Sequence, residues 1–433
     1  NVNQIKMNIN KIIILALFSI GYIQAQENKP LSLKEAINLG TTKSNQAILA
    51  DTKVKTSEWE VKTVKNNQLP SASLSGKFFK LTKADVKGNL IPQSANGIDI
   101  SQLAICQANI SVPVFNGFKI QNNIKASQNL NLAEVSNAQH TKEEIALYVT
   151  QLYFSLYKTQ EMILLTEDNL KSAHQRVVDF QALEDNGLLA HNDLLKAQLQ
   201  ESNIELSLET AKKNNTVLNF QLVNFLQLPE GTKIKISEDE FKSLQTISDN
   251  SVQRKDLEAL TFQQQAAKNN IKIAQGNYYP SFNLIGGYIA LDVKNALTIT
   301  NAMNFGAGIS YDISSIFKNK KNVEKAKSQA METETQIAIL NEKITEEVQE
   351  ATENYNLAIK QKNVYQKAEL QATENYRIVL DKYNNGLSNT NDLLEANVEQ
   401  LQAKINYTVS TSDILQKYYE LQFQKGKLTQ SIN

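Results

Sequence analysis

Few residues in this chain could carry out chemistry, and their spacing does not form a reactive centre. The three histidines, His140, His174 and His191, are far apart, and the sequence contains no HExxH or CxxC motif, so we expect no dedicated metal site. Cys106 is the single cysteine, which excludes an internal disulfide. Carboxylates at helical spacing are frequent, but no nucleophile motif or cleft-forming α/β pattern accompanies them. We therefore predict no enzyme and no cofactor, and interpret such carboxylates as surface charges on helices.

The composition favours long elements over a compact globule. Lys+Arg and Asp+Glu both number 45, so no net charge points to nucleic acid or anionic lipid. The chain has only 15 Gly and 6 Pro, few for a fold with many turns. Its apolar share of 41% is below the usual roughly 45–50%, as expected for a tube with water on both sides.

The N-terminal residues 1–25 have the features of a secretory signal peptide. Met7 is the expected start, Lys11 supplies the positive region, Ile12–Ile20 is apolar, and Ala25 offers a small residue before the cut. The alternative, a transmembrane anchor, is disfavoured because the apolar run is too short for ~30 Å of hydrocarbon. Since no other segment approaches 18 apolar residues, any membrane-spanning segments must be strands.

The sequence contains an internal repeat with an offset of 199 residues. An Asn-Gly-Leu turn at 186–188 is followed by Asn-Asp-Leu-Leu at 192–195, and the same residues recur at 385–387 and 391–394. The same offset relates residues 108–111 to 307–310, and Phe118-Lys119 to Phe317-Lys318. Matching text around Pro70 and Pro280 has an offset of 210. Such ordered matches indicate a tandem duplication.

Each copy is predicted to contain a helix, a β-hairpin and a pair of long helices. The first repeat covers residues 26–230, a linker covers 231–250, and the second repeat covers 251–433. The expected elements are a helix over about 31–68, a hairpin over 70–115 and a helix pair over 118–227, and then a helix over about 251–276, a hairpin over 279–314 and a helix pair over 318–426. Neither long helix contains a proline.

All four predicted strands alternate between apolar and polar residues. Leu74 and Phe78 share a face opposite Ser73 and Ser75, and the other three strands follow the same rule. A soluble two-sheet sandwich is one interpretation. In a membrane, an open four-stranded sheet would leave its edge groups unpaired, so other subunits would have to close a barrel.

The return helices carry heptad repeats of apolar residues. Residues 190–227 contain two such seams, and residues 390–426 repeat the pattern. Two seams imply two neighbours for each helix, as in a closed ring of helices. Heptads also fit a rod-like bundle, so the alternative function is a soluble periplasmic coiled-coil scaffold protein.

With these turns and hairpins located, the sequence resembles the TolC family of outer-membrane efflux channels. The resemblance extends from Leu31-Ser32-Leu33-Lys34-Glu35-Ala36 to the last helix. It implies a mainly α fold with a membrane β-barrel, in which each chain is a tandem repeat of β-hairpin plus long helices. Three chains would form a homotrimer with a 12-stranded barrel in outer-membrane lipid and a periplasmic α-helical tube.

The resemblance also implies a passive export duct in a tripartite efflux or type I secretion system. Such a channel spans the cell outer membrane of a Gram-negative bacterium and extends into the periplasm. Its partners would be a periplasmic adaptor (membrane fusion) protein and an inner-membrane transporter of RND, ABC or MFS type. No nucleic acid and no cofactor are implied.

Site residues follow from the resemblance at matching positions. Asp392 and Glu395, three apart and so on one helical face, would line the pore constriction, although Asp392 also suits an ordinary helix N-terminus. Asp193 and Tyr383 would form a latch at the tip, where Ser388 replaces an arginine found in some members. The expected adaptor-contact turns contain Gly187, Leu188, Gly386 and Leu387.

Overall fold

The protein consists of two compact units, each assembled from separate stretches of the chain. The computed structural model describes residues 28–84, 100–236, 251–294 and 297–432. The first unit comprises Asn1–Ala50, Gln139–Arg254 and Lys343–Asn433, and the second comprises Asp51–Ala138 and Lys255–Glu342. The predicted signal peptide and most of the predicted linker lie outside the described residues.

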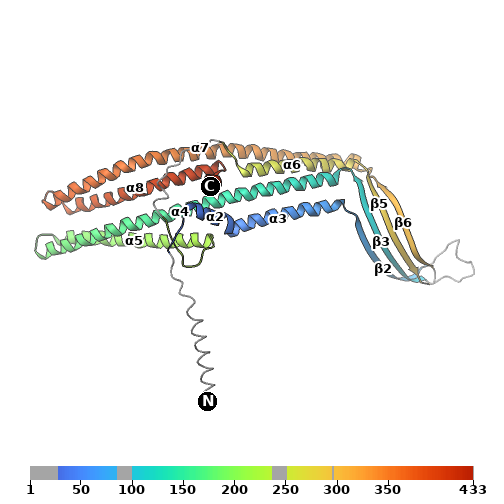
Figure 1. Ribbon diagram of the computed structural model, residues 1–433, viewed down its shortest axis with the longest axis horizontal. Coiled ribbons are helices and arrows are strands. Elements are labelled where there is room, and N and C mark those ends of the chain that lie inside the picture. Colours follow the sequence, from blue (N-terminus) through green and yellow to red (C-terminus); the bar gives the residue numbers. More distant parts are fainter. Residues whose placement is uncertain (1–27, 85–99, 237–250, 295–296, 433) are drawn as a thin grey trace, which may run out of the picture. The chain divides into compact units, whose positions relative to one another are not determined.

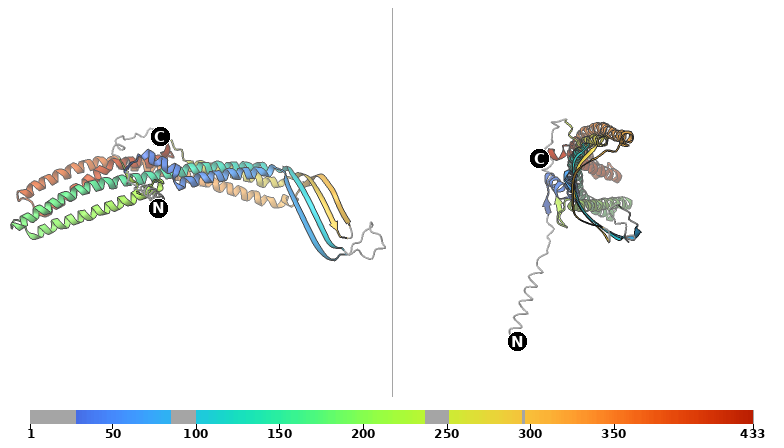
Figure 2. Two further views of the ribbon diagram at one scale, coloured as in Figure 1. Left: turned by 60° about the horizontal axis from the view of Figure 1, so that its bottom comes forward. Right: turned by 90° about the vertical axis from the view of Figure 1, so that its right-hand side faces the viewer.

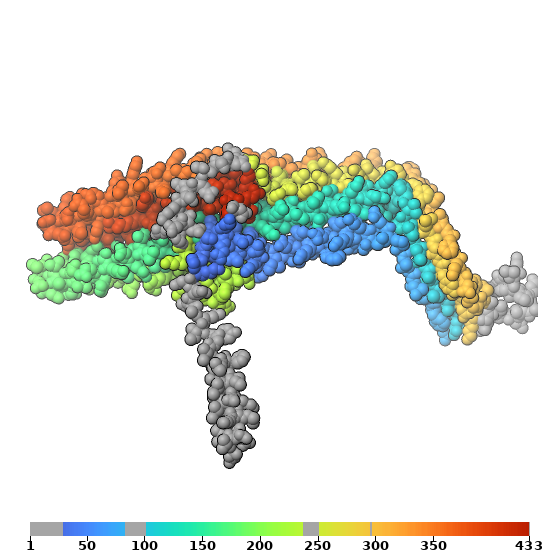
Figure 3. Space-filling view, viewed as in Figure 1, coloured from blue at the N-terminus to red at the C-terminus, as the bar shows by residue number. Residues whose placement is uncertain are grey.

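A four-stranded antiparallel sheet dominates the second unit. Its order is β2-β3-β5-β6, seen as bands from blue to orange (Figures 1 and 3). The strands are β2 (Ser71–Ala84), β3 (Ile100–Asn116), β5 (Ser281–Val293) and β6 (Leu297–Ser310). They are longer than the ~9–11 residues that a transmembrane strand requires. Each hairpin contributes one inner strand and one edge strand, so β2 and β6 form the two edges.

The register confirms the predicted alternation of the strands. One row across the sheet contains Leu74, Ala108, Tyr288 and Met303, and the next contains Ser73, Asn109, Gly287 and Asn304. Because side chains alternate across a strand, one face is mainly apolar and the other mainly polar. Pro113, which cannot donate to the ladder, lies at a register shift of β3 against β5.

The helices of the second unit lead into the sheet through matching turns. α3 (Asn45–Lys65) ends in the 3-10 turn η1 (Asn66–Gln68), and α6 (Lys255–Gln275) ends in η3 (Gly276–Tyr278). Pro70 and Pro280 follow these turns directly before β2 and β5. A proline cannot continue a helix but is tolerated ahead of a strand, which explains the position of both transitions.

Two antiparallel helix pairs and a small core make up the first unit. The elements with residues in this unit are α2 (Leu33–Lys43), α4 (Lys119–Asp185), α5 (His191–Phe225), α7 (Ser315–Asn384), α8 (Thr390–Gln424), α9 (Leu428–Ser431) and the parallel strands β1 (Asn28–Pro30) and β4 (Lys233–Lys235). The long helices α4 and α7 belong to it only from Gln139 and Lys343 onward. α4 runs beside α5, and α7 beside α8 (Figures 1 and 2). At ~1.5 Å per residue, the 67 residues of α4 and the 70 of α7 each extend about 100 Å.

The core of the first unit gathers around the middle of α4. Val149, Tyr153 and Leu156 are buried there against Leu31 and Leu222. The Tyr153 hydroxyl donates a hydrogen bond to the Leu31 carbonyl at 2.8 Å. This bond satisfies a buried hydroxyl and fixes the N-terminal segment on α4.

The helix expected over residues 31–68 is interrupted at Ser44. This residue has an extended backbone (φ −62°, ψ 148°), and its side chain accepts a hydrogen bond from the Ala47 N–H at 3.2 Å. Ser44 is therefore both the end of α2 and the N-terminal cap of α3.

Candidate functional site at the two helical turns

The α4–α5 and α7–α8 turns have the same backbone geometry. Gly187 (φ 73°) and Gly386 (φ 71°) are left-handed. In each turn the glycine N–H donates to the carbonyl three residues earlier, and the leucine N–H donates to the carbonyl five residues earlier, at 2.7–3.0 Å. This pattern terminates both helices at a glycine. It leaves Leu188 and Leu387 75% and 77% exposed, available for a partner.

The acidic residues of the second turn lie at the start of α8. The Asn389 side chain caps the helix by accepting from the Asp392 N–H at 3.0 Å, and the Ser388 hydroxyl donates to the Asp392 carboxylate at 2.9 Å. Glu395 is exposed and has no ion pair or hydrogen bond to any described residue. Neither carboxylate forms an ion pair with a cationic side chain among the described residues.

The first turn differs in charge at the matching positions. Lys196 donates to Asp193 at 3.2 Å, an ion pair within the first turn of α5. This pair is electrically neutral, whereas Asp392 and Glu395 together carry two negative charges. The two repeats therefore differ in electrostatic potential at the matching positions of their turns.

Tyr383 contacts α4, the helix that leads into the first turn, through its ring. The ring lies 5.7 Å from that of Phe180, at an interplanar angle of 26°. It packs on a cluster in which Leu194 and Leu393 are buried. Within the described part of the chain no hydrogen bond joins Tyr383 to Asp193, so the two predicted latch residues are neighbours of one cluster rather than a bonded pair.

A buried arginine connects the α4–α5 helix pair to the α7–α8 helix pair. Arg176 of α4 is only 8% exposed. Its guanidinium donates to the Gln200 side chain of α5 at 3.2 Å and to the Tyr376 hydroxyl of α7 at 3.1 Å. A buried charge that loses a partner is costly, so these contacts hold α7 against α4.

The same network continues to α8. Gln200 donates to the Leu394 carbonyl at 3.2 Å and to the Asn397 side chain at 3.4 Å. Asn397, itself buried, donates to Asn169 of α4 at 3.1 Å. One chain of hydrogen bonds thus connects α4, α5, α7 and α8. Sequence reasoning missed it, although the scarcity of arginine, three residues among 45 Lys+Arg, was a usable signal.

Two histidines connect α4 to α5 near the first turn. His191 lies 2.6 Å from Glu184, and His174 lies 2.7 Å from Glu201. Each pair holds one histidine and one carboxylate, which is too few ligands for a metal ion. Among the described residues, no group of three or more potential metal ligands occurs.

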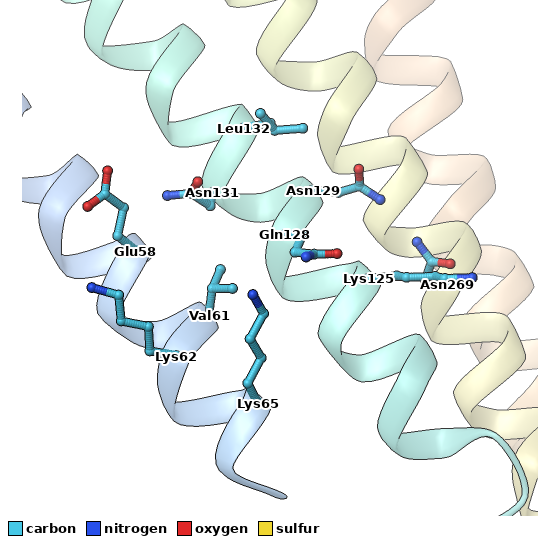
Figure 4. A pocket seen from close by; sticks show the side chains of 10 residues that line it. All are labelled: Glu58, Val61, Lys62, Lys65, Lys125, Gln128, Asn129, Asn131, Leu132 and Asn269. Atoms are coloured by element: carbon cyan, nitrogen blue, oxygen red, sulfur yellow. The ribbon is translucent and has the colours of Figure 1, made fainter. Parts of the chain in front are cut away.

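A cavity of the second unit lies between α3, α4 and α6, and lysines and amides form most of its polar lining. It has a volume of about 590 Å³, and Lys62, Lys65 and Lys125 border it (Figure 4). Lys62 is 3.9 Å from the centre of the Trp59 ring and makes a cation–π contact. No set of side chains in it resembles a catalytic centre.

The helices give no membrane-spanning candidate: none within the described ranges is both long and apolar enough to cross a bilayer.

The sheet with one apolar face and the two long helical hairpins ending in Gly-Leu turns match the fold of solved outer-membrane channels. Residues 246–426 match the family model described as "Outer membrane efflux protein". This part of the chain is therefore an outer membrane efflux protein domain, and the resemblance to the TolC family is confirmed.

Similar proteins agree with this class. The outer membrane efflux protein BepC of Brucella suis biovar 1 (strain 1330) is 20% identical over 409 residues, covering 90% of this chain and 88% of BepC. The outer membrane protein VceC of Vibrio cholerae has a TM-score of 0.75 at 16% identity, covering 91% of this chain and 96% of VceC. The Campylobacter jejuni CmeC outer membrane channel has a TM-score of 0.76 at 15% identity, covering 94% of this chain and 91% of CmeC. At these identities the structures establish the fold, which is mainly α with the TolC-like sheet. The matched family is one of efflux proteins and not of enzymes.

Proposed function

We propose that three copies of this chain form a passive export channel in the outer membrane of a Gram-negative bacterium. In this proposal each copy contributes four strands to one twelve-stranded barrel and its long helices to a periplasmic tube. The sheet of the second unit, with its exposed apolar face and two open edges, is the observation that supports this most.

The apolar face of the sheet is suited to lipid. Its large side chains are exposed, Phe305 at 86%, and no described element covers them; the set is Leu74, Phe78, Ile110, Leu284, Met303, Phe305 and Ile309. Contiguous exposed apolar surface of this kind indicates contact with a membrane or a partner. The opposite face carries Ser73, Asn109 and Asn304, which suits a water-filled lumen.

The two edges of the sheet call for partner subunits. In the part of the chain that the structure describes, β2 and β6 each have one side without a neighbouring strand. In hydrocarbon, every unpaired N–H or C=O group costs several kcal/mol. Adjacent strands alternate in direction across the sheet, so β6 of one copy can pair antiparallel with β2 of the next. Identical copies can therefore close a barrel without any further element.

The helical turns are suited to an adaptor. We assign Gly187, Leu188, Gly386 and Leu387 to contacts with a periplasmic adaptor protein, which would in turn bind an inner-membrane transporter of RND, ABC or MFS type. The exposed leucines support this assignment because each turn offers an apolar side chain on a rigid backbone. The channel would thus serve a tripartite efflux or type I secretion system.

The second turn is suited to guard the pore. By threefold symmetry, Asp392 and Glu395 would form two rings of three carboxylates, which attract cations and repel anions. For the closed tip, we propose that Tyr383 acts through its ring on Phe180 and that Asp193 acts through its pair with Lys196. The Arg176 network then supplies the polar contacts between the helix pairs.

Cell fractionation and bilayer recordings test the proposed function. We expect the mature protein in the outer-membrane fraction, soluble only with detergent, and we expect the purified trimer to give stepwise, cation-selective currents in a planar bilayer. Recovery from the periplasm without detergent, together with silent bilayers, would favour the soluble coiled-coil scaffold instead.

A further inference from the structure

A second cavity in the second unit lies where the sheet meets the helices. Its volume is about 460 Å³, and polar side chains form nearly all of its wall. Ser281 and Ser310, which are register partners, border it from the sheet. Both serines lie in a row of the polar face of the sheet. In the proposed barrel this cavity therefore opens toward the lumen, and the inference rests on the proposed function for this orientation.

Both copies of the duplicated Phe-Lys pair contribute their lysine to this cavity. Lys119 begins α4, Lys318 lies in the first turn of α7, and both border the cavity. The Lys119 ammonium donates to the Asn277 side chain at 3.1 Å, which leaves two of its three protons for another acceptor. One lysine from each repeat of the same chain therefore borders this polar cavity.

Two glycines bring Lys119 to this position. Gly117 has φ +59°, and a Cβ added to it would lie 2.2 Å from the Gly276 carbonyl oxygen. A Cβ on Gly276 would lie 2.4 Å from the side chain of Lys119. Only glycine at both places permits this close approach of the start of α4 to the end of α6.

A buried hydroxyl in the cavity wall has no partner. Ser315 is 8% exposed, and its Oγ makes no hydrogen bond to any residue that the structure describes. The buried Asn319 beside it is fully engaged, since it donates to the Ala274 carbonyl at 2.7 Å and accepts from Asn322 at 3.3 Å. An unsatisfied buried hydroxyl is uncommon and calls for a ligand or an ordered water.

The charged side chains that line the cavity determine which charge a ligand must carry to bind there. Asp312 also borders the cavity, but its carboxylate accepts from the N–H and hydroxyl of Ser314, at 3.0 and 2.7 Å. Two lysines against one aspartate leave a single positive charge. Among the described residues, the Lys119 ammonium has one hydrogen-bond partner and the Ser315 hydroxyl has none, and Lys318 acts on Asp312 through its charge. The cavity therefore offers donors for an anion rather than ligands for a cation.

We propose that this cavity binds the oxyanion group, phosphate or carboxylate, of a small soluble solute through Lys119, Lys318 and Ser315. A phospholipid headgroup carries the same chemistry, but the polar face of the sheet favours a solute from the lumen.

Calorimetric titration of the detergent-purified full chain with inorganic phosphate tests this site, and it needs no open pore. We expect saturable binding that weakens about tenfold or more in the Lys119→Gln/Lys318→Gln double variant. Lys320→Gln, which removes an exposed α7 lysine outside the cavity, serves as the control and should bind phosphate like the unaltered protein.

Ser315→Ala separates ligand binding from folding. Because the hydroxyl has no partner, this variant should melt at the same or a higher temperature in phosphate-free buffer, yet gain less stability from phosphate than the unaltered protein. Phosphate binding that is absent, or equal in all variants, would overturn the site, as would lysine-dependent binding to phosphatidylglycerol vesicles without binding of free phosphate. A protein that conducts but does not bind phosphate refutes only the site, whereas one that binds phosphate but does not conduct refutes the channel.

Discussion

The guanidinium of Arg176 donates a hydrogen bond to the hydroxyl of Tyr376 at 3.1 Å, although the residues belong to different copies of the repeat. Arg176 also holds Gln200 on its own helix pair. Movement of one pair against the other would break the contact with Tyr376 and leave a buried charge with fewer partners. This relationship makes the network a candidate for the element that keeps the tip closed.

Removing the Tyr376 hydroxyl should loosen this contact. Tyr376→Phe is expected to lower stability by about 1–2 kcal/mol and to raise basal conductance. A double-mutant cycle with Arg176→Leu should give a coupling energy of about 1 kcal/mol or more. Arg377→Leu is the control, because that exposed arginine pairs within its own helix with Glu374 and Asp381. Purely additive effects of the two substitutions would mean that the contact between Arg176 and Tyr376 does not stabilise the closed tip.

Substitutions at Tyr383 distinguish ring packing from a hydroxyl latch. Tyr383→Phe retains the ring on Phe180 and should leave basal conductance near its original level. Tyr383→Ala empties part of the cluster and should raise it. If the phenylalanine variant leaks as much as the alanine variant, the hydroxyl is essential, and a bond to Asp193 in the assembled channel becomes the better explanation.

The acidic rings should determine ion selectivity. Neutralising six carboxylates of the trimer with Asp392→Asn and Glu395→Gln is expected to lower the cation-over-anion permeability ratio at least about threefold and to weaken block by divalent cations. Asp193→Asn is the matched control, because Lys196 already neutralises that carboxylate. Selectivity that survives the double change would remove both residues from the constriction.

Glycine substitutions should differ in cost according to the space around them. Gly117→Ala forces a positive φ and a steric overlap with Gly276, so we expect a loss of about 2 kcal/mol or more. Gly187→Ala shares the positive φ but meets no atom within 4 Å, and should cost about 1 kcal/mol. Thermal unfolding in detergent compares the two; equal losses would show that the approach of α4 to α6 is not tight.

Much of this fold could be predicted because its determinants are local. The period-two pattern fixed which residues share a face of each strand, and the absence of proline over α4 and α7 indicated their length. The Gly-Leu turns are also local signals, because a left-handed residue at a helix end favours glycine. The Asp193–Lys196 pair follows from a spacing of three on one helix.

The features that were not predicted from the sequence depend on contacts between residues far apart in the chain. Arg176 and Tyr376 stand alone in long helical stretches, and nothing nearby in sequence marks them as partners. The meeting of Lys119 and Lys318 depends equally on the sheet that brings the two hairpins together. The break at Ser44 was overlooked because serine occurs commonly within helical sequences, and only its extended backbone identifies it as a cap.

Cysteine crosslinking between the sheet edges tests the central claim, that copies of this chain close one barrel. Three strand spacings of ~4.8 Å separate β2 from β6 within one chain, beyond the ~7 Å that a disulfide spans between Cα atoms. In a Cys106→Ala background, Ser73→Cys on β2 is combined in turn with Asn304→Cys, Gly306→Cys and Gly308→Cys on β6. We predict that at least one pair gives covalent trimers in outer membranes under oxidising conditions, and that reduction returns them to monomers. Only monomers from every pair would contradict the account.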